Sequence, residues 1–196
     1  MDDESLIQLV TNLINLPKET ETVEFKENNY DKDNIGKRIS ALSNSANLHD
    51  RKNAHLVFGI KDNTHEVIGT HFLPSQEKVG NEDLIFWLSK QINPSIDFRV
   101  YEFKFNNLPI VIIEIPPATT QPVKFNEIPY IRVGTATPKL IDYPEKESKI
   151  WNKINKNNFE KGIAKENLSV PEVLELLDYS KYFSLTGGTF RYVPIC

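Results

Sequence analysis

The sequence predicts an α+β fold in which helices flank a mixed β-sheet. Some short segments alternate apolar and polar residues or are wholly apolar, as in strands. Between them lie longer segments whose apolar residues recur every three or four positions, as in helices. The most apolar strand candidate is 110–115, and the clearest helix candidate is 33–48. Prolines and polar turn residues separate these segments, as expected for one folded domain of this class.

Composition limits the domain organisation and the type of partner. The 196 residues are 39% hydrophobic and 26% charged, which suits a single domain or one domain with the start of another. The formal net charge is −4, so the chain is not a general polyanion binder. Any surface for nucleic acid must therefore be a local basic patch.

The ends and the cysteine content predict a cytoplasmic protein with no membrane partner. The start, Met-Asp-Asp-Glu, lacks the basic and apolar regions of a secretory signal. No apolar run approaches the roughly 18 residues of a membrane span. The only cysteine is Cys196, which excludes disulfides and cysteine-based zinc clusters.

The first half of the chain reads as helix, strand, helix, loop and hairpin. We expect an amphipathic helix over 4–16, a strand over 22–26 and a helix over 33–48 that Asp33 caps. In the first strand Val23 and Phe25 face inward, and Glu24 and Lys26 share the other face. The elements that follow are a basic loop (47–54), a strand (55–60), a turn (62–64) and a short strand (66–68) that ends at Gly69.

The second half of the chain is also predicted to contain both helices and strands. Asn81 is expected to cap a helix that carries Leu84, Leu88 and Ile92. The remaining elements are two strands between 97 and 115 around Asn106-Asn107, a strand at 130–133, a helix at 143–159 and a capping box at Ser169–Glu172. We expect one domain over 1–162. Residues 163–196 are either the helical start of a truncated second domain or a packed C-terminal arm.

Several common catalytic motifs are missing. The chain has no Gly-x-x-x-x-Gly-Lys-Ser/Thr phosphate loop and no Gly-x-Ser-x-Gly elbow. Its four histidines lie between 49 and 71 at spacings that fit no zinc site.

Carboxylates near the first two strands offer a different chemistry. If those strands pair, Glu24 and Asp62 meet at one end or face, and Glu19 joins them if it lies in the turn before the strand. Three such oxygen ligands would bind Mg²⁺ or Mn²⁺ and position a water on phosphate, with Lys26 polarising that phosphate. The alternative is a solvated acidic edge.

Four ordered segments resemble one family. They are Glu19-Thr-Glu-Thr-Val-Glu24-Phe25-Lys26, Ile39-Ser-Ala41-Leu-Ser-Asn44-Ser, Leu56-Val-Phe-Gly59-Ile-Lys-Asp62 and Val67-Ile-Gly69. This pattern, over roughly 19–133, is similar to the Schlafen AlbA-type (divergent AAA-type) domain of bacterial transcriptional regulators. The resemblance implies nucleic-acid association, often beside C-terminal winged-helix or ATP-binding segments. The family's Gly-Gly pair before the second strand is replaced here by the basic loop 48–54.

The animal branch of that family implies a sharper hypothesis. Its members resemble endoribonucleases that act on structured RNA such as tRNA, with a divalent metal held by three carboxylates. Those carboxylates correspond to Glu19, Glu24 and Asp62, with Lys26 or Arg38 stabilising phosphate charge. The animal enzymes use a duplicated arrangement, which this single copy would need a homo-oligomer to imitate.

Two basic sets are candidates for a nucleic-acid surface. The first and favoured set is Lys26, Lys37, Arg38, Arg51 and Lys52. The second is Lys149, Lys153 and Lys156 on one helical face, with Lys146 and Trp151 nearby. The spacing of Trp151 to Ile154 favours a core position for the tryptophan.

Three functions stay open. The first is a nucleic-acid-binding module (DNA or RNA), and the second is a metal-dependent ribonuclease. The third is a protein-interaction or oligomerisation domain that uses a sheet edge or the C-terminal arm.

Overall fold

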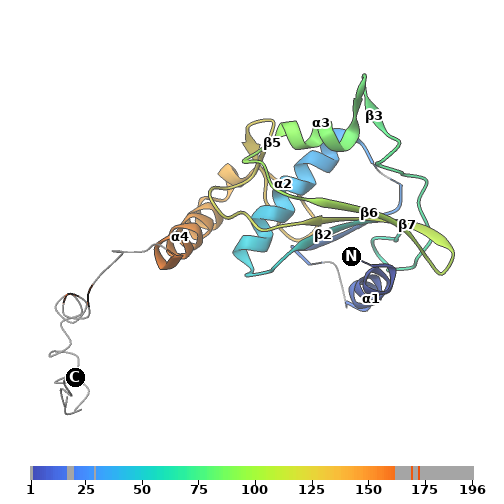
Figure 1. The fold of residues 1–196 in the computed structure, drawn as a ribbon, viewed down its shortest axis with the longest axis horizontal. Helices are drawn as coiled ribbons and strands as arrows, with labels where there is room; N and C mark the ends of the chain where they lie inside the picture. The colour runs from blue at the N-terminus through green and yellow to red at the C-terminus, as the bar shows by residue number, and fades with distance from the viewer. Residues whose placement is uncertain (1, 17–19, 29, 162–168, 170–171, 173–196) are drawn as a thin grey trace, which may run out of the picture. The chain divides into compact units, whose positions relative to one another are not determined.

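The computed structural model describes residues 2–16, 20–28, 30–161, 169 and 172 (Figure 1). The helices are α1 (Asp3–Ile14), α2 (Lys32–Leu48), α3 (Leu84–Gln91) and α4 (Pro144–Lys161), with a 3-10 helix at Leu140–Asp142. The strands are β1 (Val23–Lys26), β2 (Ala54–Phe58), β3 (Lys78–Val79), β4 (Glu82–Asp83), β5 (Ile92–Asn93), β6 (Arg99–Phe105), β7 (Leu108–Ile115), β8 (Lys124–Phe125) and β9 (Ile128–Pro129). The chain divides into two compact units, 1–159 and 160–196.

The main sheet is mixed, as predicted. Its strand order is β1-β2-β7-β6, in which β1 and β2 are parallel and the other neighbours are antiparallel. Glu24 lies opposite Leu56, so the pairing of the first two predicted strands is confirmed. Asn106 and Asn107 both have positive φ (51° and 64°) in the predicted β6–β7 turn, which suits asparagine in a tight hairpin.

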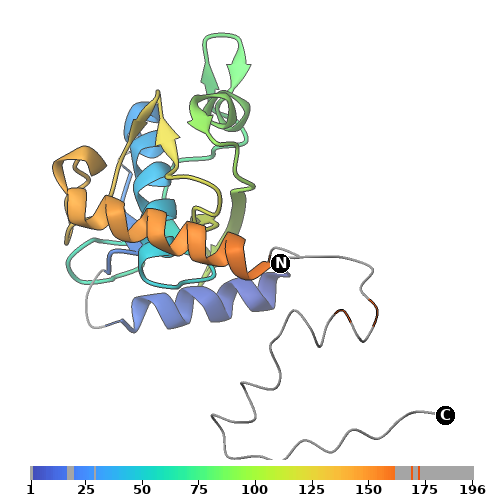
Figure 2. The same cartoon turned by 90° about the vertical axis from the view of Figure 1, so that its left-hand side faces the viewer.

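Each face of this sheet has its own apolar core. Alternation sends Leu56 and Phe58 of β2 to a cluster with α2, while Val57 joins a cluster with α1. The apolar residues of β7 likewise alternate between the α2 cluster and the α1 cluster. Helices α1 and α2 therefore cover opposite faces of the sheet (Figures 1 and 2).

Helix α2 also carries buried polar side chains that hydrogen-bond a neighbouring segment of the chain. The side chain of Asn44 donates to the carbonyls of Val123 and Tyr130, both at 2.8 Å, and accepts from the Val123 amide at 2.7 Å. The Ser40 hydroxyl donates to the Val123 carbonyl and accepts from the Tyr130 amide. These side chains satisfy backbone groups of Val123 and Tyr130, which flank the β8–β9 hairpin, because a buried backbone group needs a hydrogen bond. Gly36 leaves room for Phe125, whose ring a Cβ there would meet at 2.1 Å.

Gly59 directs the chain out of β2. Its φ of +99° is one that residues with a Cβ rarely adopt, and a Cβ would also meet Ile110 at 2.7 Å. The Gly59 amide donates to the Lys26 carbonyl at 2.7 Å, and the Gly59 carbonyl accepts from Ile68 at 2.9 Å. The turn that carries Asp62 is thereby held beside the end of β1.

Several predicted boundaries were wrong, each for a local reason. Helix α2 is capped by Asp31, which accepts from the Asn34 amide at 2.9 Å, so Asp33 lies inside its first turn. Asn81 lies in the turn of the β3–β4 hairpin beside Gly80, and the N-cap of α3 is Asp83.

The predicted strands 66–68 and 130–133 are reduced to isolated bridges. The segment 163–196 lies outside the described residues, apart from Ser169 and Glu172. There the Ser169 amide donates to the Glu172 carboxylate at 2.9 Å, as in a capping box. Within the described residues, no helix is long and apolar enough to cross a membrane.

Candidate functional site

The candidate site lies at the carboxyl ends of the two parallel strands. Strands β1 and β2 are joined by α2, so both strands end at the same edge of the sheet. Lys26 is the last residue of β1, and Asp62 follows the Gly59 turn after β2. Ligands of open sheets commonly bind at this edge.

A buried carboxylate organises the cations of the site. Glu24 is only 2% exposed, and its Oε1 accepts from Arg38 Nε at 2.9 Å. Lys26 Nζ lies 3.4 Å from the same oxygen, and Arg132 Nη1 lies 2.9 Å from Oε2. A buried charge is tolerated when it is paired in this way. Glu24 thus fixes the three cations around it.

Arg132 is a residue of the candidate site that the sequence analysis did not predict. Its side chain is fully buried, and Nη1 donates to the Thr135 carbonyl at 2.9 Å and to Thr137 Oγ1 at 3.1 Å. It lies within the predicted strand at 130–133. An arginine within a predicted strand is the signal that could have indicated a buried ion pair, since arginine is rarely buried unless it is paired.

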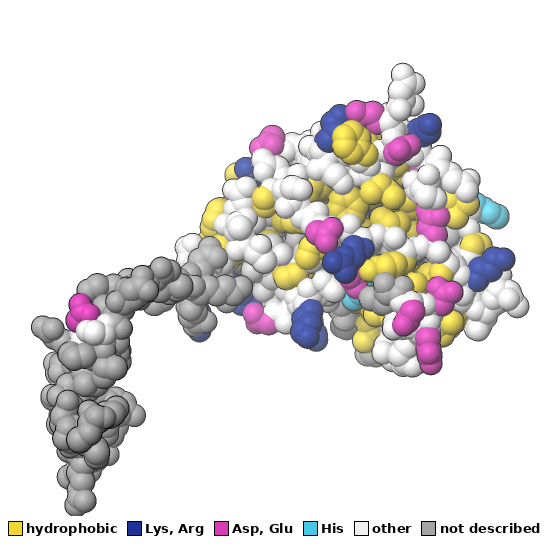
Figure 3. Space-filling model, in the orientation of Figure 1, with side chains coloured by type: hydrophobic (Ala, Val, Ile, Leu, Met, Phe, Trp, Pro, Cys, Tyr) yellow, Lys and Arg dark blue, Asp and Glu magenta, His cyan; other side chains and the backbone are white. Residues whose placement is uncertain are grey.

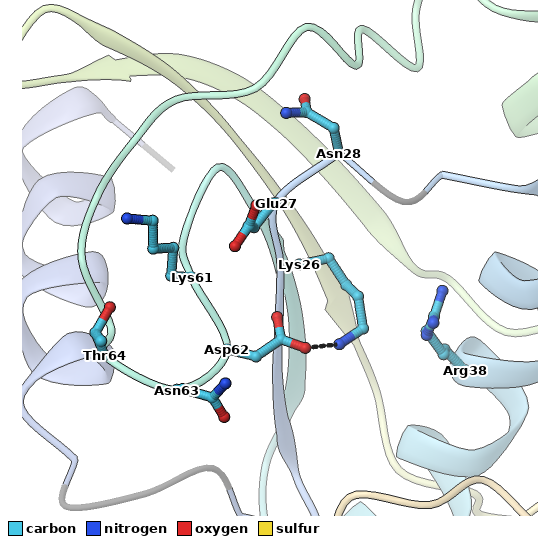
Figure 4. A pocket seen from close by; sticks show the side chains of 8 residues that line it. All are labelled: Lys26, Glu27, Asn28, Arg38, Lys61, Asp62, Asn63 and Thr64. Carbon is cyan, nitrogen blue, oxygen red and sulfur yellow. Dashed lines mark hydrogen bonds and ion pairs between the residues drawn. The ribbon is translucent and has the colours of Figure 1, made fainter.

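Asp62 is the more exposed carboxylate of the site. Its Oδ2 accepts from Lys26 Nζ at 2.5 Å, and its side chain is 42% exposed (Figure 4). Figure 4 shows Lys26 and Arg38 approaching from β1 and α2, with Asp62 on the turn that follows β2. The predicted meeting of Glu24, Lys26 and Asp62 at one edge is therefore seen, with the lysine between the two acids.

Three neighbouring pockets share residues here. The central pocket, of about 760 Å³, is lined by Lys26, Glu27, Asn28, Arg38, Lys61, Asp62, Asn63 and Thr64. The Lys139 pocket, of about 400 Å³, is lined by Asn34, Lys37, Arg38, Tyr130, Thr137, Pro138 and Lys139. The Tyr30 pocket, of about 460 Å³, is lined by Asn28, Tyr30, Asp31, Lys32, Glu77, Lys78, Val79 and Leu84. Because Arg38 and Asn28 are shared, the three pockets form one continuous surface, called here the basic surface.

The basic surface is cationic although the chain is acidic. Seven lysine and arginine side chains line it, against four carboxylates. Lys37 and Lys139 make no ion pair within the described residues, and the Lys139 pocket is lined by no acidic side chain. On the face that Figure 3 shows, basic and acidic side chains are interspersed. The cationic character is therefore local.

The described residues around Glu24 do not suit a divalent cation. The Glu24 oxygens are buried against Lys26, Arg38 and Arg132, which would repel a metal ion. No group of three metal-ligating side chains occurs among the residues that the structure describes. Glu19 lies outside them, so the three-carboxylate site stays a prediction.

Arg51 and Lys52 lie in a different pocket. This α1 pocket, of about 670 Å³, is also lined by Asp2, Glu4, Ser5, Gln8, Leu9, Asn12, Asn53, His55 and Glu114. His55 Nε2 lies 4.0 Å from Glu114 Oε2, and burial lowers the pKa of His55 to about 4. The predicted basic set is thus divided: Lys26, Lys37 and Arg38 line the basic surface, and the other two line the α1 pocket.

Two members of the second basic set have structural contacts. Lys153 Nζ donates to the Leu48 carbonyl at 2.8 Å and pairs with Asp50 at 2.5 Å. Lys146 pairs with Glu21 at 3.1 Å. Trp151 is 38% exposed, so its predicted core position was wrong. On α4 the core positions are filled by Ile150 and Ile154 instead.

Comparison with known proteins identifies the family. The family model described as "Schlafen, AlbA_2" matches residues 19–140, which is more than half of the chain. The chain belongs to the Schlafen AlbA_2 family. The match contains β1, α2, β2 and both arginines that contact Glu24, so the candidate site lies within the Schlafen AlbA_2 domain.

Two solved structures are also similar to the chain. One is the DIP2311 protein from Corynebacterium diphtheriae, with 18% identity, a TM-score of 0.49 and coverage of 69% of this chain; the match spans 26% of that protein. The other is the N-terminal domain of a RecG-related protein from Nitrosomonas europaea, with 16% identity, a TM-score of 0.43 and coverage of 66% of this chain and 90% of that one. No curated protein sequence matches significantly.

Proposed function

We propose that this Schlafen AlbA_2 domain binds nucleic acid through its phosphate backbone along the basic surface. The observation that carries the proposal is the pair of cations Lys37 and Lys139, which line one pocket with Arg38 and have no acidic partner among the described residues. Unpaired cations on an acidic chain are suited to exchange their counterions for phosphates. Family membership supports the same role.

The charge network behind this surface supports binding rather than catalysis. Glu24 fixes Arg38 between the central and Lys139 pockets, so its charge is positioned before a ligand arrives. A preordered arginine loses less side-chain freedom on binding than a mobile one. The same contacts leave Glu24 unsuited to activate a water, since both of its oxygens face cations.

Charge reversal on the two surfaces tests the proposal. Fluorescence anisotropy would compare a labelled oligonucleotide binding to wild type, to Lys37→Glu/Lys139→Glu and to the matched control Arg51→Glu/Lys52→Glu. We expect the first variant to lose at least about tenfold in affinity, with a shallower salt dependence by about two charges. The control should stay within about twofold. Equal losses in both variants would contradict the proposed surface.

A cleavage assay separates binding from the ribonuclease alternative. A tRNA-like hairpin incubated with Mn²⁺ should stay intact under our proposal. Asp62→Asn is the suitable variant, because Asp62 is 42% exposed and its loss should leave the fold intact. Cutting by wild type that Asp62→Asn abolishes, with binding retained, would establish the nuclease instead.

A further inference from the structure

The ring of Tyr30 forms a flat aromatic platform at the surface. It stacks on Phe72 with centroids 4.7 Å apart and an interplanar angle of 9°. Phe72 is fully buried and makes an edge contact with Phe58 at 4.7 Å. One face of Tyr30 is thus held by the core, while the residue is 37% exposed. Tyr30 also lines the Tyr30 pocket.

This platform lies at one end of the basic surface. Asn28 lines both the Tyr30 pocket and the central pocket, so the pocket that holds Tyr30 adjoins the one that Lys26 and Lys61 line. The Asn28 Oδ1 accepts from Thr70 Oγ1 and from the His71 amide, both at 2.9 Å. Its side-chain oxygen is therefore occupied, and its NH₂ group, which donates to no described residue, can donate to a ligand.

Among the residues that the structure describes, the other large aromatic rings near the surface lack this combination. Trp87 is partly buried against the core, and the Lys32 ammonium lies 5.2 Å from its ring centre, which covers that face. Phe86 is 60% exposed and Trp151 is 38% exposed, but neither lines the pockets of the basic surface. Within the described part of the chain, Tyr30 is the exposed ring that is both supported from beneath and next to a pocket lined by cations.

We infer that Tyr30 stacks on an unpaired base, and that the ligand of this domain is single-stranded nucleic acid. This inference rests on the proposed function, because the cations must hold the backbone while the base reaches the ring. Aromatic side chains beside a cationic surface bind single strands in this way, since every base has a stacking face. The bases of an intact duplex are already stacked and cannot offer one.

Binding to matched ligands tests the inference. Wild type, Tyr30→Phe and Tyr30→Leu would be titrated with a single-stranded 12-mer, its abasic analogue and the corresponding duplex. We expect wild type and Tyr30→Phe to prefer the 12-mer over the other two ligands. Tyr30→Leu should bind the 12-mer about tenfold more weakly and the abasic strand unchanged. A 2-aminopurine in the strand should be quenched by wild type and not by Tyr30→Leu.

The outcomes separate the two proposals. If Tyr30→Leu binds the 12-mer as wild type does, while Lys37→Glu/Lys139→Glu loses affinity, the stacking site is wrong and the basic surface stands. If wild type prefers the duplex, the single-strand ligand is wrong. If wild type binds none of the three ligands, both proposals fail. Thermal unfolding of each variant, expected within a few degrees of wild type, shows that the loss is not one of folding.

Discussion

The basic surface and the α1 pocket are made of similar residues but differ in how their charges are paired. In the first, the buried Glu24 faces three cations within 3.4 Å. In the second, the buried Glu114 has its nearest ion-pair partner among the described residues in His55, at 4.0 Å. The α1 pocket is lined by three carboxylates and two fixed cations, and the central and Lys139 pockets by more cations than acids.

This difference shows that a count of basic residues does not locate a surface of net positive charge. Arg51 and Lys52 are adjacent and exposed, yet Asp2, Glu4 and Glu114 line the same pocket. Lys37 and Lys139 are about a hundred positions apart and line a pocket without acids. What distinguishes the two regions is therefore the residual charge after local pairing, which only the fold determines.

The largest expected effect follows from removing the buried carboxylates. Glu24→Gln leaves the surrounding cations without their counter-charge and should destabilise the fold by about 3–5 kcal/mol. Glu114→Gln, at a similarly buried position without a close cation, should cost less than about 1 kcal/mol. Urea denaturation of the two variants measures both. Equal losses would mean that the network around Glu24 contributes no specific stability.

The pH dependence of stability should come from the α1 pocket. His55 has a pKa of about 4 in the folded state and about 6.5 unfolded, so its contribution is complete above pH 6.5. As the pH falls from 6.5 to 4, the unfolded chain takes up the proton first, and about 2–3 kcal/mol of stability should be lost.

Urea titrations at pH 7 and pH 4.5 would measure this loss, with His55→Gln as the control. The variant should lose less stability over this range than wild type does. An identical pH dependence in the two proteins would assign the effect to other groups.

A smaller effect is expected at the exposed acid of the central pocket. Asp62→Asn removes a negative charge and releases Lys26, so affinity for an oligonucleotide should rise by about three- to fivefold. Glu4→Gln in the α1 pocket is the matched control and should change nothing. Anisotropy at a fixed, low salt concentration measures both. A decrease in affinity for Asp62→Asn would show that the carboxylate itself contacts the ligand.

Local patterns predicted most of the main sheet and the helix faces. The alternation in β1, the short apolar run in β2 and the three- and four-residue spacing in α2 predicted these elements, and the turn at Asn106-Asn107 predicted the β6–β7 hairpin. The pairing of β1 with β2 also followed, because both are short apolar strands separated by one helix. These features depend on residues that are neighbours in sequence, which is why they could be predicted.

The missed features depend on distant residues. The strands within segment 123–130 are only two residues long, so they show no periodic pattern in the sequence. Their segment is held instead by Ser40 and Asn44, some eighty positions earlier. Arg132 joins Glu24 across more than a hundred residues. The separation of Arg51 and Lys52 from Lys37 was likewise unpredictable, because the loop between α2 and β2 carries them toward α1.

The most direct test is to map the contact surface by NMR. Backbone amide shifts of the labelled protein would be followed during titration with a short single-stranded oligonucleotide. The account predicts that the largest changes occur at Asn28, Lys37, Lys61 and Lys139, with little change at Arg51 and Lys52. Changes concentrated at 51–55 and along α1, with the basic surface silent, would contradict it.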